Sequence, residues 1–503
     1  MDVISSLYQG FATAITLQNL YLAFIGCLWG TVVGVLPGIG PVAGITLLIP
    51  VTYGMDATGA IIMMAGIYYG AMYGGSTTSI LMNIPGESAS VITCLDGYQM
   101  TLKGRGGAAL FIAAFGSWVG GTLSIVGLML LAPLLAEFAM KFGPPEMFSI
   151  YLVAFILLAS LGTDFFKTMP MVLLGLLLAS VGMDPLTGIL RFTHGVTHLY
   201  DGLGFVPIAM GAFGMGEILS STQESTAGRV VHRVRIREML PTREEFRASV
   251  GPIFRGSGIG FFLGLLPGSA HIVSSFMSYL VEKRLAKNPE EFGHGRIEGV
   301  AGPETANNAA SGSAMIPFPG LGIPTGPPAA VMMIALLIHG IRPGPLFISE
   351  QPLVFWGLVA SMYIGNVILL ILNLPLVGLF INLLRVPFRI LFPIVLLICL
   401  VGTYTVNLDT FELIVLLCAG ILGYVFRSWG FEIAPLVLAI ILGPGAEISF
   451  RQSLMRSAGS FSIFFHSPIS TTLIIASCLL LAWNVYKSFH PDPEKEAEAV
   501  SKG

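Results

Sequence analysis

Small neutral polar side chains surround four glycine-proline breaks in this chain, at residues 34–40, 83–89, 264–270 and 322–329. Proline removes a backbone donor and glycine permits angles outside the helix, so these residues would break a helix that crosses a membrane. A broken helix presents amide donors at the N-terminus of one half and carbonyl acceptors at the C-terminus of the other. Such ends can hold an anion such as a carboxylate and a cation such as sodium.

Two sets of ligands follow from this interpretation. The carboxylate ligands are expected at the breaks and on nearby amide side chains: Pro37, Gly38, Gly40, Asn83, Pro85, Gly86, Pro267, Gly268, Ser269, Asn307, Asn308, Pro324, Thr325 and Gly326. The ligands of a coupling cation, sodium or a proton, are expected among hydroxyl and carboxyl oxygens: Ser76, Thr77, Thr78, Glu87, Glu304 and Ser311. No cofactor and no metal site is expected. The competing interpretation is that glycine, serine and alanine only let helices pack closely.

The breaks form two pairs that occur in the same order in the two halves of the chain. GVLPG at 34–38 is echoed by GLLPG at 264–268, and the Ile-Pro pair at 84–85 by the one at 323–324. Duplicated, broken membrane segments are typical of secondary transporters. Because a broken helix is costly in lipid, two corresponding pairs of breaks favour a functional role over close packing alone.

The composition indicates that the bilayer is the main solvent of the chain. Of its 503 residues, 54% are hydrophobic and 11% are charged, with a mean hydropathy of +0.82, whereas a soluble domain has about 25% charged residues. The net charge of -3 provides no basic surface for nucleic acid. The five cysteines lack paired or metal-like spacing, so buried reduced thiols are expected.

The apolar runs predict an all-α polytopic membrane protein with a two-fold internal repeat, broken helices and roughly 12 membrane crossings. Continuous runs lie at 107–133, 147–161, 166–183, 203–220, 352–374, 390–406, 411–426, 432–444 and 461–485. Interrupted apolar segments lie at 21–53, 60–98, 256–281 and 309–341. We expect 21–53 and 256–281 to be re-entrant hairpins, which enter and leave the membrane on one side.

The polar stretches divide the chain into four parts. Residues 1–220 form the first membrane half and residues 256–489 the second. The arginine-rich stretch 221–255 between them should be a cytoplasmic loop by the positive-inside rule. Residues 490–503 form a polar tail.

Three acidic residues lie within apolar sequence, where a charge costs about 2.5 kcal/mol or more at the centre of the bilayer. Glu87, Asp96 and Glu304 could each carry a proton, bind a cation or pair with a basic residue. For Asp96, the closeness of Lys103 and Arg105 favours a structural ion pair. For Glu304, a binding site and a helix cap are equally open.

Rival function classes have less support. His194, His198 and Asp201 could hold zinc in an intramembrane metal-dependent hydrolase if their segment were helical, but Gly195 and the lack of an adjacent glutamate weigh against it. Nothing marks Asp96 and Asp201 as the paired carboxyls of an aspartyl protease. A channel-like carboxylate pore is the main alternative, and the paired breaks favour a carrier over it. We therefore expect no enzymatic activity.

Several stretches resemble the large membrane subunit of the tripartite tricarboxylate transporters, the TctA family. They are residues 34–44, 69–76, 83–87, 96–98, 298–300, 303–309 and 339–345, in order along nearly the whole chain. The resemblance implies a multi-pass secondary transporter of the bacterial inner membrane that imports citrate or related carboxylates, driven by a cation gradient. It also implies two partners, a small membrane subunit and a periplasmic solute-binding protein.

The second half departs from the family pattern at two positions. Ala270, followed by His271, and Thr325 stand where the pattern leads us to expect glycine. A methyl or hydroxyl group there changes how closely a ligand can approach the backbone. We expect His271 and Thr325 to tune the choice of substrate.

Overall fold

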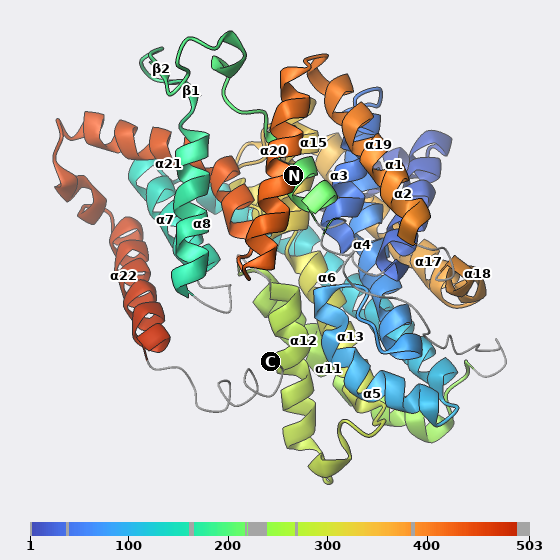
Figure 1. Cartoon of the computed structure of the whole chain (residues 1–503). Coiled ribbons are helices and arrows are strands. Elements are labelled where there is room, and N and C mark those ends of the chain that lie inside the picture. The colour runs from blue at the N-terminus through green and yellow to red at the C-terminus, as the bar shows by residue number, and fades with distance from the viewer. Residues whose placement is uncertain are drawn as a thin grey trace. The chain divides into compact units, whose positions relative to one another are not determined.

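The computed structural model describes residues 3–36, 40–159, 165–216, 219, 239–266, 270–383 and 388–489. These residues form helices and one two-stranded antiparallel hairpin, in which β1 (Gly182–Met183) pairs with β2 (Leu190–Arg191) (Figure 1). The all-helical architecture expected from the sequence is confirmed.

The chain forms two compact units, one of residues 1–140 and 206–424 and the other of residues 141–205 and 425–503. The helices that lie wholly or mostly in the first unit are α1 (Val3–Ala14), α2 (Leu17–Val35), α3 (Gly40–Thr52), α4 (Ala57–Met82), η1 (Ser88–Ser90), α5 (Val91–Leu102), α6 (Gly106–Ala139), α9 (Phe205–Ala209), η3 (Met210–Met215), α11 (Arg243–Gly264), α12 (Ala270–Leu285), η5 (Pro289–Glu291), α13 (Glu298–Ser313), α14 (Pro317–Leu321), α15 (Pro327–Ile338), α16 (Phe347–Glu350), α17 (Pro352–Asn373), α18 (Val377–Leu383), α19 (Phe388–Asn407) and α20 (Phe411–Ser428). Helices of the second unit are α7 (Pro144–Ala159), α8 (Phe165–Ala179), η2 (Thr197–Leu199), α21 (Ala434–Arg456), η6 (Phe461–Phe465) and α22 (Pro468–Phe489).

Each of the nine continuous apolar runs corresponds to helical structure, in α6, α7, α8, α9 with η3, α17, α19, α20, α21 and α22. Among the described residues, six helices are long and apolar enough to cross a membrane: α2, α6, α17, α20, α21 and α22. The protein is therefore a multi-pass membrane protein. The larger number of crossings, the repeat and the re-entrant hairpins stay predictions.

Several predicted features lie outside the described residues. The two tips, residues 37–39 and 267–269, are among them, as are the polar tail and residues 220–238 of the central loop. The last part of the predicted loop, from Arg243 to residue 255, is helical, because α11 begins at Arg243. Thr242 and Glu245 form a capping box there, each side chain accepting from the backbone N–H of the other residue.

The two helices at the centre of the first unit are buried almost along their whole length. Every residue from Gly59 to Leu81 in α4 and from Gly299 to Ser313 in α13 is buried. α13 contacts α4, α5 and α6 from the first half of the sequence and α11 and α12 from the second. Both helices are rich in glycine, alanine, serine and threonine, and these small residues let the neighbouring helices pack closely. The polar groups of α4 and α13 are therefore surrounded by protein and not by lipid.

Glycines spaced by four residues allow close contact along two helix pairs. A methyl group added at Gly26, Gly30 or Gly34 of α2 would lie 2.3 Å from a backbone carbonyl oxygen of α4. A methyl group at Gly256 or Gly260 of α11 would lie 2.4 or 2.2 Å from a carbonyl oxygen of α13. Small residues at this spacing let two backbones touch.

The substitution Gly260→Ala should destabilise the protein by about 1–3 kcal/mol, because the added methyl overlaps the Ala306 carbonyl. Gly258→Ala in the same helix is the matched control, since a methyl there meets nothing within 4 Å. The control should be neutral or stabilise by up to about 1 kcal/mol through helix propensity. Thermal unfolding in detergent measures both changes, and equal shifts for the two variants would contradict the packing argument.

Asp96 does not pair with Lys103 or Arg105, so the expected ion pair is wrong. Its buried carboxylate accepts hydrogen bonds from the Tyr279 hydroxyl at 2.9 Å and from the Gly293, Gly295 and Arg296 amides at 2.7–3.0 Å. These donors come from α12 and the loop before α13. The loop amides converge on the carboxylate, which satisfies it without a basic side chain.

The two basic residues have other partners. Lys103 donates to the His294 carbonyl of the same loop, and Arg105 forms an ion pair with Glu245 at the start of α11. α5 and the turn that follows it are thus connected to the second half of the sequence through Asp96, Lys103 and Arg105.

The substitution Asp96→Asn should destabilise this loop by about 2–3 kcal/mol, because a neutral amide replaces a charged acceptor and turns an N–H group toward backbone donors. We expect faster tryptic cleavage at Arg296 and a lower melting temperature. Lys103→Gln is the control, since its contact is exposed. An unchanged cleavage rate in Asp96→Asn would show that the carboxylate does not hold the loop.

In the second unit, the β1–β2 hairpin is joined to α21 by two arginines. Arg191 contacts Glu447 at 2.6 Å, and Arg451 contacts Asp184 at 2.6 Å and Glu447 at 3.1 Å. The Arg451 hydrogen bond holds the pKa of Asp184 well below its ordinary value. This group is internally neutral and serves the local structure.

Candidate functional site

Glu304 lies inside α13, so its carboxylate is part of a buried cluster and the helix-cap interpretation is wrong. One carboxylate oxygen accepts from the Ser76 hydroxyl of α4, and the other accepts from the Thr93 hydroxyl of α5. The side chain is 1% exposed. Glu304 therefore connects the second half of the sequence to α4 and α5, the two helices on either side of the break at residues 83–89.

Glu87 lies in the break between α4 and α5, facing the same region of α13. Its Oε2 accepts from the Ala89 amide at 2.9 Å, and its Oε1 accepts from Asn307 Nδ2 at 3.0 Å. The side chain is 7% exposed. Gly75 of α4 permits this position, because a methyl there would lie 2.7 Å from Glu87 Cγ.

Two asparagines of α13 complete the cluster. Asn307 donates to Glu87, and Asn308 donates to the Ser117 hydroxyl of α6 at 2.7 Å and to the Glu304 carbonyl at 3.1 Å. Both side chains are 1% exposed, and neither Oδ1 has a hydrogen-bond partner among the described residues. Buried amide oxygens without a donor are rare, so two of them beside two carboxylates point to a positively charged ligand.

The charge balance leads to the same conclusion. The hydrogen-bond partners of Glu87 and Glu304 in the described structure are neutral hydroxyl, amide and backbone groups. An ionised carboxylate without a counter-charge is costly in a protein interior and in a membrane. A cation or protons between these groups would remove that cost.

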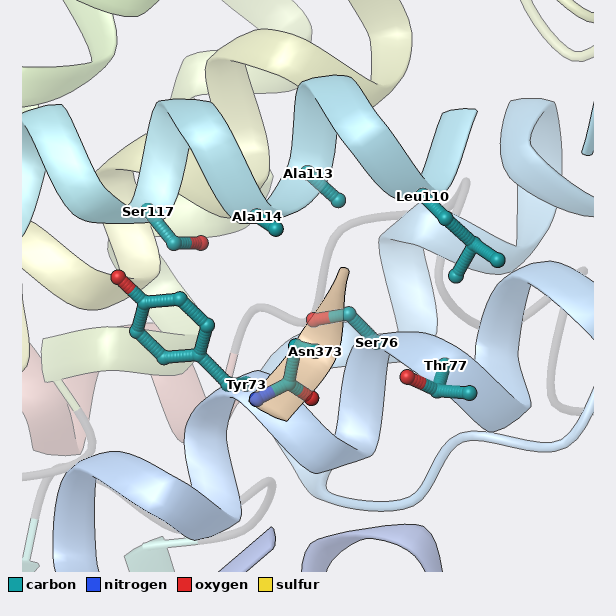
Figure 2. Close-up of a pocket in the computed structure, with 8 residues that line it drawn as sticks. All are labelled: Tyr73, Ser76, Thr77, Leu110, Ala113, Ala114, Ser117 and Asn373. Atoms are coloured by element: carbon teal, nitrogen blue, oxygen red, sulfur yellow. The ribbon is translucent and has the colours of Figure 1, made fainter. Parts of the chain in front are cut away.

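A small cavity adjoins this cluster between α4 and α6, next to the last residue of α17 (Figure 2). Its polar lining consists of Tyr73, Ser76, Thr77, Ser117 and Asn373, and leucine and alanine side chains of α6 complete it. The volume within which the centre of a water-sized sphere can lie is about 10 Å³. This is room for one water molecule or one small ion. Ser76 and Ser117 belong both to the cavity and to the Glu304 cluster.

The structure brings together five predicted residues: Ser76, Glu87, Glu304, Asn307 and Asn308. Thr77 lies beside them on the cavity wall. The hydroxyls of Thr78 and Ser311 instead donate to the backbone of their own helices, at 3.1 and 3.0 Å.

The predicted residues at the breaks are placed differently. Asn83 and Pro85 are exposed, whereas Pro324, Thr325 and Gly326 are buried. The Thr325 hydroxyl donates to the Ala314 carbonyl at 3.1 Å and so connects the break at residues 322–329 to the end of α13. Gly40 begins α3 with a positive φ of 66°. Pro37, Gly38, Pro267, Gly268 and Ser269 lie outside the described residues.

Four further residues belong to the cluster or its cavity and have no conspicuous sequence signal: Thr93, Ser117, Tyr73 and Asn373. Each is an uncharged polar residue on a helix in which small or apolar residues predominate. Their common feature is burial against α13 or the cavity, which only the tertiary structure reveals.

The rival metal site lacks the geometry that it needs. His194 has a positive φ of 47° and His198 lies in the short 3-10 helix η2, so the two histidines do not share one face of a helix. Within the described ranges, no group of three histidine, cysteine or acidic side chains is placed to hold a metal ion.

Comparison with known proteins identifies the family. The family model described as "Tripartite tricarboxylate transporter TctA family" matches residues 20–438. A curated relative from Agrobacterium vitis, "Uncharacterized 52.8 kDa protein in TAR-I ttuC' 3'region", is 46% identical over 485 residues, which are 96% of each chain. A second from the same organism, "Uncharacterized protein in TAR-II ttuC' 3'region", is 48% identical over 225 residues, which are 44% of this chain and 93% of the relative.

No solved structure gives a significant match to this chain. The family model covers more than half of the chain and includes the whole Glu87 and Glu304 cluster. The chain is therefore a membrane transport component, not an enzyme, and it belongs to the TctA family of tripartite tricarboxylate transporters.

Proposed function

We propose that this chain is the large membrane subunit of a binding-protein-dependent secondary transporter, which uses a cation gradient to import tricarboxylates or related carboxylates. The observation that carries the proposal is the pair of buried carboxylates, Glu87 and Glu304, which contact neutral donors and lie beside two unsatisfied amide oxygens. Such a group binds a cation well and would repel a carboxylate if no cation were bound.

The cation makes import of an anion against a negative interior feasible. Each charge that crosses the membrane changes the free energy by about 2.3 kcal/mol per 100 mV. Sodium or protons that bind at Glu87 and Glu304 offset this cost for the carboxylate. The carboxylate itself binds at the breaks, where helix ends offer backbone donors.

The glycine contacts support a two-fold repeat. The offset that separates Gly26, Gly30 and Gly34 from Gly256, Gly260 and Gly264 also separates Pro37 from Pro267. The contacts of α2 with α4 thus correspond to those of α11 with α13. In the proposed mechanism, this symmetry allows one element to move against another and expose the cation and carboxylate alternately.

The proposed orientation places the loop before α13 in the cytoplasm. Basic residues concentrate in the central hydrophilic stretch and in residues 282–298, and cytoplasmic loops are enriched in such residues. The Asp96 and Arg105 contacts bring the end of α5 to the same side. The periplasmic solute-binding protein would deliver the carboxylate to the opposite side, with the small membrane subunit bound in the bacterial inner membrane.

Uptake into proteoliposomes tests the proposal. The vesicles should contain this chain with its small membrane partner, and labelled citrate and a panel of dicarboxylates should be offered with and without the binding protein, a sodium gradient and a pH gradient. Saturable uptake that needs the binding protein and one gradient is expected. Non-saturable flux that ignores both gradients would instead indicate a channel-like pore and contradict coupled transport.

A further inference from the structure

We propose a second cation position in the cavity between α4 and α6, separate from the cation held by Glu87 and Glu304. This inference rests on the proposed function, because the ion would move with the same carboxylate. Its occupant is a small hard monovalent cation, sodium, bound by the side-chain oxygens of Tyr73, Ser76, Thr77, Ser117 and Asn373 (Figure 2).

The hydroxyls of the cavity direct their hydrogens elsewhere. The Ser76 hydroxyl donates to Glu304, and the Tyr73 hydroxyl donates to Asn366 Oδ1 at 2.8 Å. The Ser117 hydroxyl donates to the Glu304 carbonyl at 3.3 Å and accepts from Asn308 Nδ2 at 2.7 Å, which leaves it one lone pair. Lone pairs of these three oxygens are consequently left for the cavity, and lone pairs coordinate a cation.

Asn373 adds the strongest ligand among the neutral groups. Its Nδ2 donates to the Leu369 carbonyl at 3.0 Å, whereas its Oδ1 is buried without a hydrogen-bond partner among the described residues. The residue is 4% exposed, and Figure 2 shows its amide beside the cavity. A buried amide oxygen at a cavity wall needs a positive or donating occupant.

The size and charge of the surroundings select a cation among possible occupants. The space admits one water-sized particle and excludes a carboxylate. Glu304 contributes a negative charge directly behind Ser76, without a basic partner among the described residues. A bound sodium ion would satisfy the oxygen lone pairs and also compensate this charge, whereas a water molecule supplies only two hydrogens and no charge.

Two cation positions share Glu304 as a common neighbour, so their occupancies should be coupled. One ion lies between Glu87 and Glu304, and the other lies behind Ser76. Two cations would move with each carboxylate, and each additional charge contributes about 2.3 kcal/mol per 100 mV to the driving force.

Binding of radioactive sodium to the purified full chain in detergent tests the second position. The wild-type protein should bind two sodium ions, and Thr77→Val and Asn373→Leu, which remove cavity oxygens at nearly constant volume, should each bind one. The Hill coefficient for sodium in binding should fall from near two to near one. Thr31→Val is the matched control, since Thr31 is a buried helical threonine whose hydroxyl donates to the Cys27 carbonyl, and it should still bind two.

Melting curves without sodium would confirm that each variant is folded, and Thr77→Val carries the test if Asn373→Leu is unstable. An equal sodium count in the wild type and in both cavity variants would overturn the second position. A wild-type count of one would leave the proposed transporter intact. Failure of the proposed function itself would appear separately, as a lack of gradient-driven uptake in proteoliposomes.

Discussion

Replacement of Glu304 by glutamine should abolish cation-driven accumulation of carboxylate and lower its initial rate at least about 100-fold. Glutamine has the same shape, so one of the Ser76 and Thr93 hydroxyls keeps its oxygen acceptor, but the other then faces an NH2 group and the negative charge is lost. Loss of a charged ligand in a buried site costs about 3 kcal/mol of cation binding, and this corresponds to about 100-fold in affinity. Labelled uptake driven by a sodium or pH gradient measures the effect.

Glu298→Gln is the control for this prediction. Glu298 also lies in α13, but its carboxylate pairs with Arg296 at 2.7 Å outside the cluster. This variant should retain most of its gradient-driven uptake. Exchange of labelled for unlabelled carboxylate without a gradient should persist in Glu304→Gln, since it requires carboxylate binding and movement of the loaded site but no net cation flow. Wild-type accumulation by Glu304→Gln would exclude Glu304 as the coupling residue.

The sequence alone could reveal Glu87 and Glu304 because a charge in apolar sequence is conspicuous. It could not reveal the helix that holds Glu304. Residues 299–308 of α13 fall in none of the predicted membrane segments, since alanine, glycine and asparagine form no apolar run. Hydropathy detects contact with lipid, and α13 is surrounded by protein on all sides.

The partners of the predicted residues were equally beyond sequence reasoning. Asp96 has Lys103 and Arg105 close by in sequence, yet it binds backbone amides nearly 200 positions away. Thr93 and Ser117 are ordinary hydroxyl residues until α5 and α6 pack on α13. Local pattern thus identifies which residues are unusual, whereas tertiary packing decides what they contact.

Gly86→Ala should have the second-largest effect, with loss of transport and a destabilisation of about 3 kcal/mol. Gly86 lies in the break at residues 83–89, where this segment contacts α2 and α4. An added methyl would lie 2.2 Å from the Gly34 carbonyl oxygen of α2, 2.5 Å from Gly75 Cα of α4 and 2.8 Å from Thr78 Oγ1. Two of these atoms belong to the backbone, so a side-chain rotation cannot relieve the overlap, and such overpacking costs about 1–3 kcal/mol or more.

Movement of the break to make room for the methyl would also displace the adjacent Glu87, because Gly75 touches both Gly86 and Glu87. We therefore expect Gly86→Ala to reduce sodium binding even in the fraction of protein that remains folded. Gly54→Ala is the control, since a methyl there meets nothing within 4 Å in the loop before α4. Melting temperature, sodium binding and carboxylate uptake should be measured on both variants. Normal stability and sodium binding in Gly86→Ala would show that the break can shift without disturbing Glu87, and the close contact of Gly86 with α2 and α4 would then not be what positions the cation site.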